Sequence, residues 1–343
     1  MHDGIPMQSA FVTGLAGLEL APHEAALLRA ARPCGIILFK RNILEPEQVR
    51  RLIGAARTAV GAQDFLVLID QEGGRVQRLT PPHWRDRPAA ARYGAAWARD
   101  PAGAVRAARF AAQLAALDLV ALGINTSCAP VLDLALPGGH TIIGDRAYGA
   151  TPDRVVALGR AVAEGLLAGG VLPVIKHIPG HGRAAKDSHL ELPTVAATRA
   201  DLEASDFVPF RALADLPAAM TAHVVFPAVD AAAPASISAR LTREVIRGSI
   251  GFDGLLMSDD LGMAALSGSM PQRAQAVLQA GSDVALLCNG DFAEMEAVAA
   301  IVPPLAGRSQ ARFERACAAI GPQQALDVAT AEACLAEVLR ADA

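Results

Sequence analysis

The sequence lacks two features that would point away from a globular enzyme. No apolar run reaches the roughly 18 residues that a membrane-spanning helix needs. There is no basic surplus, since 31 Lys and Arg stand against 35 Asp and Glu, giving a formal charge of −4 at pH 7. Phosphate binding needs such a surplus gathered on one face. Neither nucleic acid nor a membrane is therefore an expected partner.

Cysteine is also scarce and poorly arranged for cross-linking. The five cysteines are odd in number, widely spaced and set mostly in apolar surroundings. This pattern favours small buried side chains in a reducing compartment over a disulfide framework or a zinc site. The first residues carry neither the basic region nor the continuous apolar region of a secretory signal. We therefore expect a cytoplasmic protein.

The residues that are present indicate a chain with a large core. Hydrophobic residues make up 52% and charged residues 19% of the sequence, which excludes general disorder. No linker or repeat divides the chain, so we predict one domain over residues 1–343, with its core at about 8–300 and a C-terminal helical extension at about 301–343. We expect a monomer or a weak dimer.

Short β-rich runs alternate with Ala- and Leu-rich stretches of helical periodicity, which is typical of parallel strands joined by helices. Most of the runs are continuously apolar, as expected for strands that are covered on both faces. The predicted strands are Ala10–Thr13, Gly35–Phe39, Phe65–Ile69, Ile124–Ala129, Leu172–Lys176, Ala218–His223, Gly254–Ser258 and Asp283–Leu287. Eight such units predict an α/β fold, a single (β/α)8 TIM-type barrel, with an open doubly wound sheet as the alternative.

The helical stretches lie between these strands and in the tail. They cover Glu24–Ala31, Glu45–Ala59, Ala104–Leu119, Asp153–Leu167, Leu241–Arg247, Pro271–Ala280, Phe292–Ala300, Gln310–Ala319 and Thr330–Arg340. The last three are expected to pack outside the barrel. Long gaps follow the third to fifth strands, and in a barrel the loops after the strands build the active site.

Polar residues cluster where the predicted strands end. The third strand runs into Asp70-Gln71-Glu72-Gly73-Gly74-Arg75-Val76-Gln77-Arg78, and the fifth into Lys176-His177-Ile178-Pro179-Gly180-His181-Gly182 followed by Asp187-Ser188-His189. Gly144-Asp145-Arg146, His223 and Ser258-Asp259-Asp260 follow other strands. Any one of these could be an ordinary salt bridge or helix cap. Five successive strand ends together indicate a catalytic mouth.

The segment after the fifth strand combines histidines with a carboxylate. Asp187 and His189 are two residues apart, close enough for the carboxylate to fix the imidazole tautomer and prepare a general acid/base. Metal ligation is the competing interpretation. Barrel hydrolases that use metals characteristically place a His-x-His pair after the first strand, which here ends in Thr13-Gly14. We therefore expect no metal.

Asp259 and Asp260 end the seventh strand. A carboxylate at this place, facing a general acid across the barrel mouth, is half of a glycosidase pair. Successive strand side chains point to opposite faces, so only one of the two is expected to face the pocket. The other is expected to cap the following helix. The residue pattern alone does not choose between them.

Taken together, these segments resemble the signature of family 3 glycoside hydrolases of the β-N-acetylhexosaminidase branch. The His-Pro-Gly-His-Gly and Asp-Ser-His segments, the Asp70–Arg78 run, Ile143-Gly144-Asp145-Arg146 and Ser258-Asp259-Asp260-Leu261 match in the same order, over about residues 35–289. Ile178 stands where Phe is common. The single-domain length resembles the bacterial cytoplasmic enzymes of peptidoglycan recycling, which release terminal GlcNAc from GlcNAc-1,6-anhydro-N-acetylmuramic acid and its peptides.

This resemblance implies roles for individual residues and no cofactor. Asp259 would be the nucleophile of a retaining mechanism with a covalent intermediate, and His189 the general acid/base, oriented by Asp187. The residues implied to bind the bound GlcNAc are Asp70, Arg78, Arg146, Lys176 and His177. His181 and His223 are expected to shape the pocket. A histidine is an uncommon acid here, but a free imidazole titrates near 6.5 and can both donate and accept protons at neutral pH.

Four other functions remain open at this point. One is a β-glucosidase or β-xylosidase of the same family, whose acid usually comes from a second domain. Another is a phosphorylase that uses phosphate in place of water. The remaining two are a metal-dependent barrel hydrolase and a binding protein with an inactive site.

Overall fold

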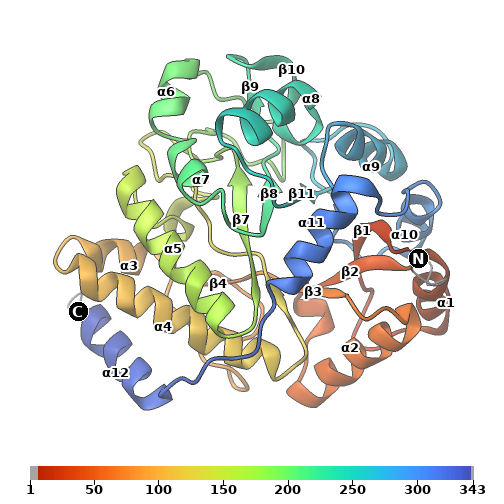
Figure 1. The fold of residues 1–343 in the computed structure, drawn as a ribbon, viewed down its shortest axis with the longest axis horizontal. Helices are drawn as coiled ribbons and strands as arrows, with labels where there is room; N and C mark the ends of the chain where they lie inside the picture. The colour runs from red at the N-terminus through yellow and green to blue at the C-terminus, as the bar shows by residue number, and fades with distance from the viewer. Residues whose placement is uncertain (1–6, 341–343) are drawn as a thin grey trace.

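The computed structural model describes residues 7–340 and contains a closed barrel of eight parallel strands. Around the barrel the strands follow the order β1-β12-β11-β8-β7-β6-β3-β2. Helices surround these strands (Figure 1). Their bounds are β1 Ser9–Gly14, β2 Pro33–Leu38, β3 Leu66–Ile69, β6 Thr126–Ser127, β7 Leu172–Ile178, β8 Ala218–Thr221, β11 Leu255–Asp260 and β12 Val284–Leu287. Closure confirms the TIM-type barrel and excludes the open sheet.

The strands are continuously apolar because both faces of each strand are buried, as predicted. In β1, Ala10 and Val12 belong to the cluster inside the barrel, whereas Phe11 packs outward under the helices. The strand predicted over Ile124–Ala129 is shorter than expected. The regular strand ends at Ser127, although the carbonyl oxygens of Ala129 and Pro130 still accept from β7 and Val131 bridges Lys176. A proline has no N–H to donate to the ladder, so it interrupts the strand.

Helices cover the outside of the barrel. They are α1 Pro22–Ala31, α2 Pro46–Val60, α3 Ala90–Trp97, α4 Pro101–Val120, α5 Pro152–Ala168, α6 Arg199–Ala204, α7 Val208–Ala212, α8 Ala239–Leu241, α9 Met270–Gln279, α10 Phe292–Ala299, α11 Gly307–Ala318 and α12 Val328–Leu339. The predicted helix Leu241–Arg247 is α8 followed by a π-helix, Thr242–Ser249. Helix α5 begins at Pro152, one residue before the predicted start, and the Thr151 side chain makes no capping hydrogen bond.

The two C-terminal helices have different positions. Helix α12 packs outside against α3 and α4, as expected. Helix α11 instead covers the amino-terminal end of the barrel, where Phe313 and Ala316 join the interior cluster. Arg312 fixes it there through ion pairs to Asp253 and Asp283, which directly precede β11 and β12. Helix α11 therefore lies outside the strands, as predicted, but at the base of the barrel, which its apolar face closes.

The segments after the strands gather at the opposite end. The hairpin of β4 Gln71–Gly73 and β5 Val76–Gln77 follows β3, and the hairpin of β9 Val225–Phe226 and β10 Asp230–Pro234 follows β8. Long loops follow β6 and β7, as their spacing predicted. Within residues 7–340, no helix combines the length and apolar character needed to cross a membrane.

Candidate active site

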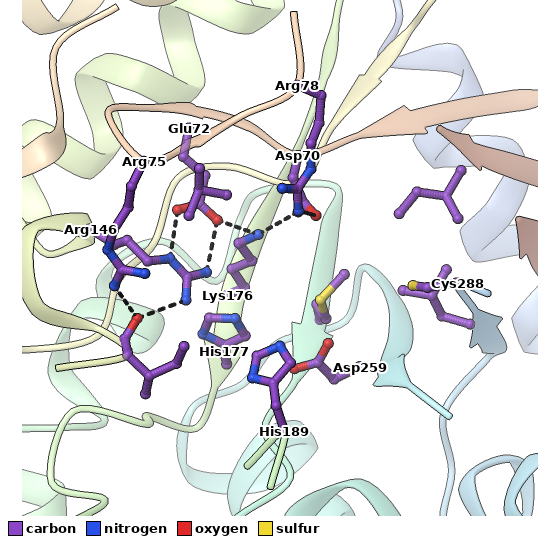
Figure 2. Close-up of a pocket in the computed structure, with 15 residues that line it drawn as sticks. Asp70, Glu72, Arg75, Arg78, Arg146, Lys176, His177, His189, Asp259 and Cys288 are labelled. Atoms are coloured by element: carbon purple, nitrogen blue, oxygen red, sulfur yellow. Dashed lines mark hydrogen bonds and ion pairs between the residues drawn. The ribbon is translucent and has the colours of Figure 1, made fainter. Parts of the chain in front are cut away.

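A pocket of about 160 Å³ opens at the carboxyl ends of the strands. Its floor is apolar, because Ile37, Met220 and Leu286 belong to strands of the barrel interior. Charged groups from several loops surround its mouth (Figure 2). The lining residues are Ile37, Asp70, Glu72, Arg75, Val76, Arg78, Ile142, Arg146, Lys176, His177, His189, Met220, Asp259, Leu286 and Cys288.

Asp70 follows β3 and is held between two cations. Its carboxylate accepts from Lys176 Nζ at 2.8 Å and from Arg78 Nη2 at 2.9 Å. Burial opposes ionisation, but the two cations outweigh it and hold the pKa of Asp70 well below its usual range. Burial alone would lower the pKa of Lys176, but the carboxylates of Asp70 and Glu72 outweigh this effect and raise it. The three charges therefore persist at neutral pH.

Glu72 also lines the pocket, although neither the pattern nor the resemblance assigned it a role. Arg146 donates to both of its oxygens at 2.8 Å, and Lys176 Nζ lies 2.6 Å from Oε1 (Figure 2). Burial again opposes ionisation, but Lys176 and Arg146 lower the pKa of Glu72. The one indication of Glu72 in the sequence was its position within the polar Asp70–Arg78 run after the third predicted strand. The β4–β5 hairpin returns it to the pocket beside Asp70.

Arg75 joins two loops at the rim. It donates from Nε to Asp145 at 2.8 Å and from Nη2 to the carbonyl oxygens of Thr141 and Ile142 at 2.9 and 2.5 Å. Arg146 turns inward to Glu72, and Asp145 pairs with Arg75 instead.

Lys176 and His177 are adjacent on β7, yet both line the pocket. The register of β7 against β8 shifts between Lys176 and Ile178, which interrupts the usual alternation of faces. His177 Nδ1 lies 2.6 Å from Oδ2 of buried Asp133. Burial disfavours the Asp133 carboxylate, but His177 and His181 more than compensate and lower its pKa. No sequence motif marked Asp133, because only the course of the chain beyond Pro130 brings it beside β7.

Asp259 and Asp260 have opposite environments. Asp259 lines the pocket, and its Oδ1 accepts from the Asp260 backbone N–H at 2.8 Å. Burial opposes its ionisation, but His177 and His223 lower its pKa. Asp260 points away, accepts from the N–H groups of Gly262 and Cys288, and has a pKa raised mainly by burial. It caps a turn, not the helix predicted, since α9 begins only at Met270.

His181 and His223 lie behind the pocket, and neither is among its lining residues. Burial lowers the pKa of His223, so the neutral ring donates from Nε2 to the Asp260 carbonyl at 3.0 Å and accepts at Nδ1 from Ser236, 2.7 Å away. It thereby holds the backbone that carries Asp259. His181 contacts Ser188, which lies seven residues further along the same loop.

Asp187 and His189 form the hydrogen bond that their spacing predicted. Asp187 Oδ1 lies 2.8 Å from His189 Nδ1 and also accepts from the His189 backbone N–H at 2.9 Å. Asp187 is mostly covered, with its side chain 16% exposed, whereas that of His189 is 57% exposed. Its hydrogen bonds from His189 lower the pKa of Asp187 against a desolvation effect. Figure 2 shows the His189 ring at the mouth beside Asp259.

The residues that the structure describes offer no metal-binding cluster of three or more His, Cys, Asp or Glu side chains. The expectation of buried cysteines holds for Cys34 and Cys128, while Cys288, Cys317 and Cys334 are half-buried. Cys288 lines the pocket, where burial raises the pKa of its thiol well above the ordinary value. All five cysteines are unpaired.

Comparisons with known proteins agree with this geometry. Residues 12–320 match the glycosyl hydrolase family 3 N-terminal domain. A β-hexosaminidase of Alkalilimnicola ehrlichii is 46% identical over 280 residues, covering 80% of this chain and 79% of that protein. The structure of NagZ from Neisseria gonorrhoeae in complex with N-trifluoroacetyl-D-glucosamine superposes with a TM-score of 0.85 at 32% identity, covering 98% of this chain and 99% of the other.

A longer relative has the same barrel. The glycoside hydrolase family 3 β-N-acetylglucosaminidase from Paenibacillus sp. superposes with a TM-score of 0.85 at 31% identity. The match covers 96% of this chain and 66% of that protein. With a matching domain over most of its length and curated relatives of one activity, the chain belongs to glycosyl hydrolase family 3, as a β-N-acetylhexosaminidase.

Proposed function

We propose that this enzyme releases terminal GlcNAc from peptidoglycan fragments, GlcNAc-1,6-anhydro-N-acetylmuramic acid and its peptides, with retention of configuration. The observation that carries the mechanism is that Asp259 and the Asp187-paired His189 line the same pocket. A retaining glycosidase needs a nucleophile and a general acid/base, normally two carboxyl groups. Here an ionised carboxylate would be the nucleophile, and an imidazole would take the place of the second carboxyl group.

In the first step, Asp259 attacks the anomeric carbon and forms a glycosyl-aspartate ester. The bond to the glycosidic oxygen breaks, and His189 gives its proton to that oxygen. Because Nδ1 of His189 is committed to Asp187 at 2.8 Å, Nε2 is the nitrogen that exchanges the proton. In the second step, His189 Nε2 takes a proton from water, which attacks the same carbon and frees Asp259.

The sugar is held by the charge network. Asp70, Arg78, Arg146, Lys176 and His177 line the pocket and present donors and acceptors for hydroxyl groups and the N-acetyl group. Ion pairs with Asp70 and Glu72 hold Arg78, Arg146 and Lys176 in fixed positions before substrate arrives. Asp133 holds His177 in the same way. Such preorganisation reduces the ordering needed on binding.

The shape of the pocket supports removal of a terminal sugar. The apolar floor of Ile37, Met220 and Leu286 closes the inner end, so a polysaccharide cannot pass through. A non-reducing terminal GlcNAc fits this arrangement, with the remainder of the fragment at the open mouth. The glucosamine derivative bound by the gonococcal relative is a sugar of the same class.

The charge balance favours water over phosphate as the acceptor. Each cation of the pocket has a carboxylate partner: Arg75 with Asp145, Arg78 and Lys176 with Asp70, and Arg146 with Glu72. Inorganic phosphate would have to compete with these carboxylates for the same cations. Release of GlcNAc 1-phosphate on addition of phosphate would instead support the phosphorylase alternative.

We also propose that the enzyme acts in the cytoplasm without a metal or cofactor, as a monomer or a weak dimer. The five unpaired cysteines fit a reducing compartment. Fractionation of cells with compartment markers tests the location, and light scattering across a concentration series tests the assembly. A periplasmic protein or a concentration-independent oligomer would contradict the proposal.

The test of the mechanism compares 4-nitrophenyl β-N-acetylglucosaminide, the corresponding β-glucoside and the disaccharide GlcNAc-1,6-anhydro-N-acetylmuramic acid. We expect strong preference for the N-acetylated sugars and loss of turnover in Asp259→Ala with an unchanged melting temperature. Mass spectrometry with a fluorinated, slowly hydrolysed sugar should find the label on the peptide that carries Asp259. A label on the peptide of another carboxylate would refute the assignment, as would inverted product.

A further inference from the structure

The loop that carries His189 contains a buried hydroxyl group next to the catalytic pair. In this loop, residues 183–192, Lys186, His189 and Leu190 are exposed, whereas Ser188 is only 2% exposed. Ser188 lies between Asp187 and His189. Its buried hydroxyl can therefore fix the position of both members of the pair.

The partner of this hydroxyl is His181, which is 3% exposed and follows β7. His181 Nε2 lies 3.0 Å from Ser188 Oγ. The His181 backbone N–H in turn donates to Asp133 at 2.6 Å, and the other oxygen of Asp133 bonds His177. The loop is thus tied through two buried groups to the strand that bears a sugar-binding residue.

The protonation of His181 suits this contact. Burial lowers the pKa of His181 to about 4, so the ring is neutral near pH 7. Its Nδ1 is buried without a hydrogen-bond partner. A neutral imidazole has one donor and one acceptor nitrogen, and an orphaned buried N–H is the rarer state. The tautomer with the proton on Nε2 therefore fits best, with Ser188 Oγ as the acceptor.

We propose that His181 is a positioning residue whose hydrogen bond to Ser188 holds the loop with His189 at the pocket mouth. Backbone contacts assist it, because Ala264 and Ala265 donate to the carbonyl oxygens of His189 and Ser188. The inference rests on the proposed role of His189 as general acid. Loss of the bond displaces the acid and leaves Asp259 and the sugar contacts in place.

The experiment measures kcat and KM of Ser188→Ala and His181→Gln on the disaccharide and on the 4-nitrophenyl substrate. A nitrophenolate leaves with little protonation, so the acid matters mainly for the disaccharide. We expect kcat on the disaccharide to fall about tenfold in Ser188→Ala, with little change in KM or on the aryl substrate. His181→Gln, which keeps a donor amide, should retain more activity than His181→Ala.

Two further variants distinguish a failure of the proposed role of His181 from a failure of the proposed role of His189. Ser282→Ala removes another buried serine hydroxyl, before β12 at the far end of the barrel, and should change neither substrate's kinetics. His189→Ala should also lose more kcat on the disaccharide than on the aryl substrate, and by a larger factor than Ser188→Ala. If it does not, the proposed role of His189 as general acid is wrong. If His189→Ala shows the dependence and Ser188→Ala does not, the role of His181 is refuted.

Discussion

Replacing Glu72 with Gln tests how much of the stability of this barrel depends on a buried charge at its mouth. The side chains of Glu72, Arg146 and Lys176 are 6%, 9% and 3% exposed, and three contacts of 2.6–2.8 Å join them. Gln keeps the shape but removes the negative charge, which leaves two buried cations undercompensated. Removing one partner from such a pair typically costs about 3–5 kcal/mol, and we expect that loss of unfolding free energy.

Asp145→Asn is the matched control. Arg75 and Asp145 meet at the same 2.8 Å, but their side chains are 43% and 44% exposed. Water screens an ion pair at that exposure, so the change should cost less than about 1 kcal/mol. Urea unfolding at pH 7, followed by circular dichroism, measures both differences. Equal costs, or a Glu72→Gln cost below that of the control, would refute the reasoning from burial.

The effect of Glu72→Gln should also depend on pH in a defined direction. The pKa of Glu72 is lowered in the folded protein, so its carboxylate stabilises the fold fully above its unfolded pKa of about 4.3. That contribution is lost as the pH falls through the lower folded pKa. The gap between wild type and variant should therefore be widest near neutral pH and narrow in acid. A gap that widens in acid would contradict this sign.

Three further outcomes follow from the site. Asp133→Asn weakens the anchor of His177 and should lower kcat/KM about 10- to 100-fold, measured on the aryl substrate; an unchanged value would remove Asp133 from the site. His223→Ala loses the bond to the Asp260 carbonyl and should lower kcat about tenfold with KM nearly constant, since His223 does not line the pocket. Incubation with EDTA should leave activity intact, because residues 7–340 gather no metal-binding cluster; inactivation reversed by zinc would contradict this.

The sequence was sufficient to place the strands and most of the polar residues that line the pocket. Continuous apolar runs mark strands covered on both faces, and the residues just beyond them meet at one end of any barrel. For that reason Asp70, Lys176 and the Asp259–Asp260 pair could be assigned to one mouth from the pattern, whereas the choice of Asp259 over Asp260 depended on the family resemblance. The Asp187–His189 bond was also predictable, because it spans only two residues.

What the tertiary structure decided depends on contacts between distant segments or on local breaks in regular geometry. The β4–β5 hairpin returned Glu72 to Arg146, 74 residues away, and so redirected the arginine from its neighbour Asp145. The course of the chain beyond Pro130 brought Asp133 to His177, 44 residues away, and no sequence motif had indicated this contact. A register shift in β7 let both Lys176 and His177 face the pocket. Local patterns determine where a strand ends, but side-chain pairing at its end depends on how several loops pack together.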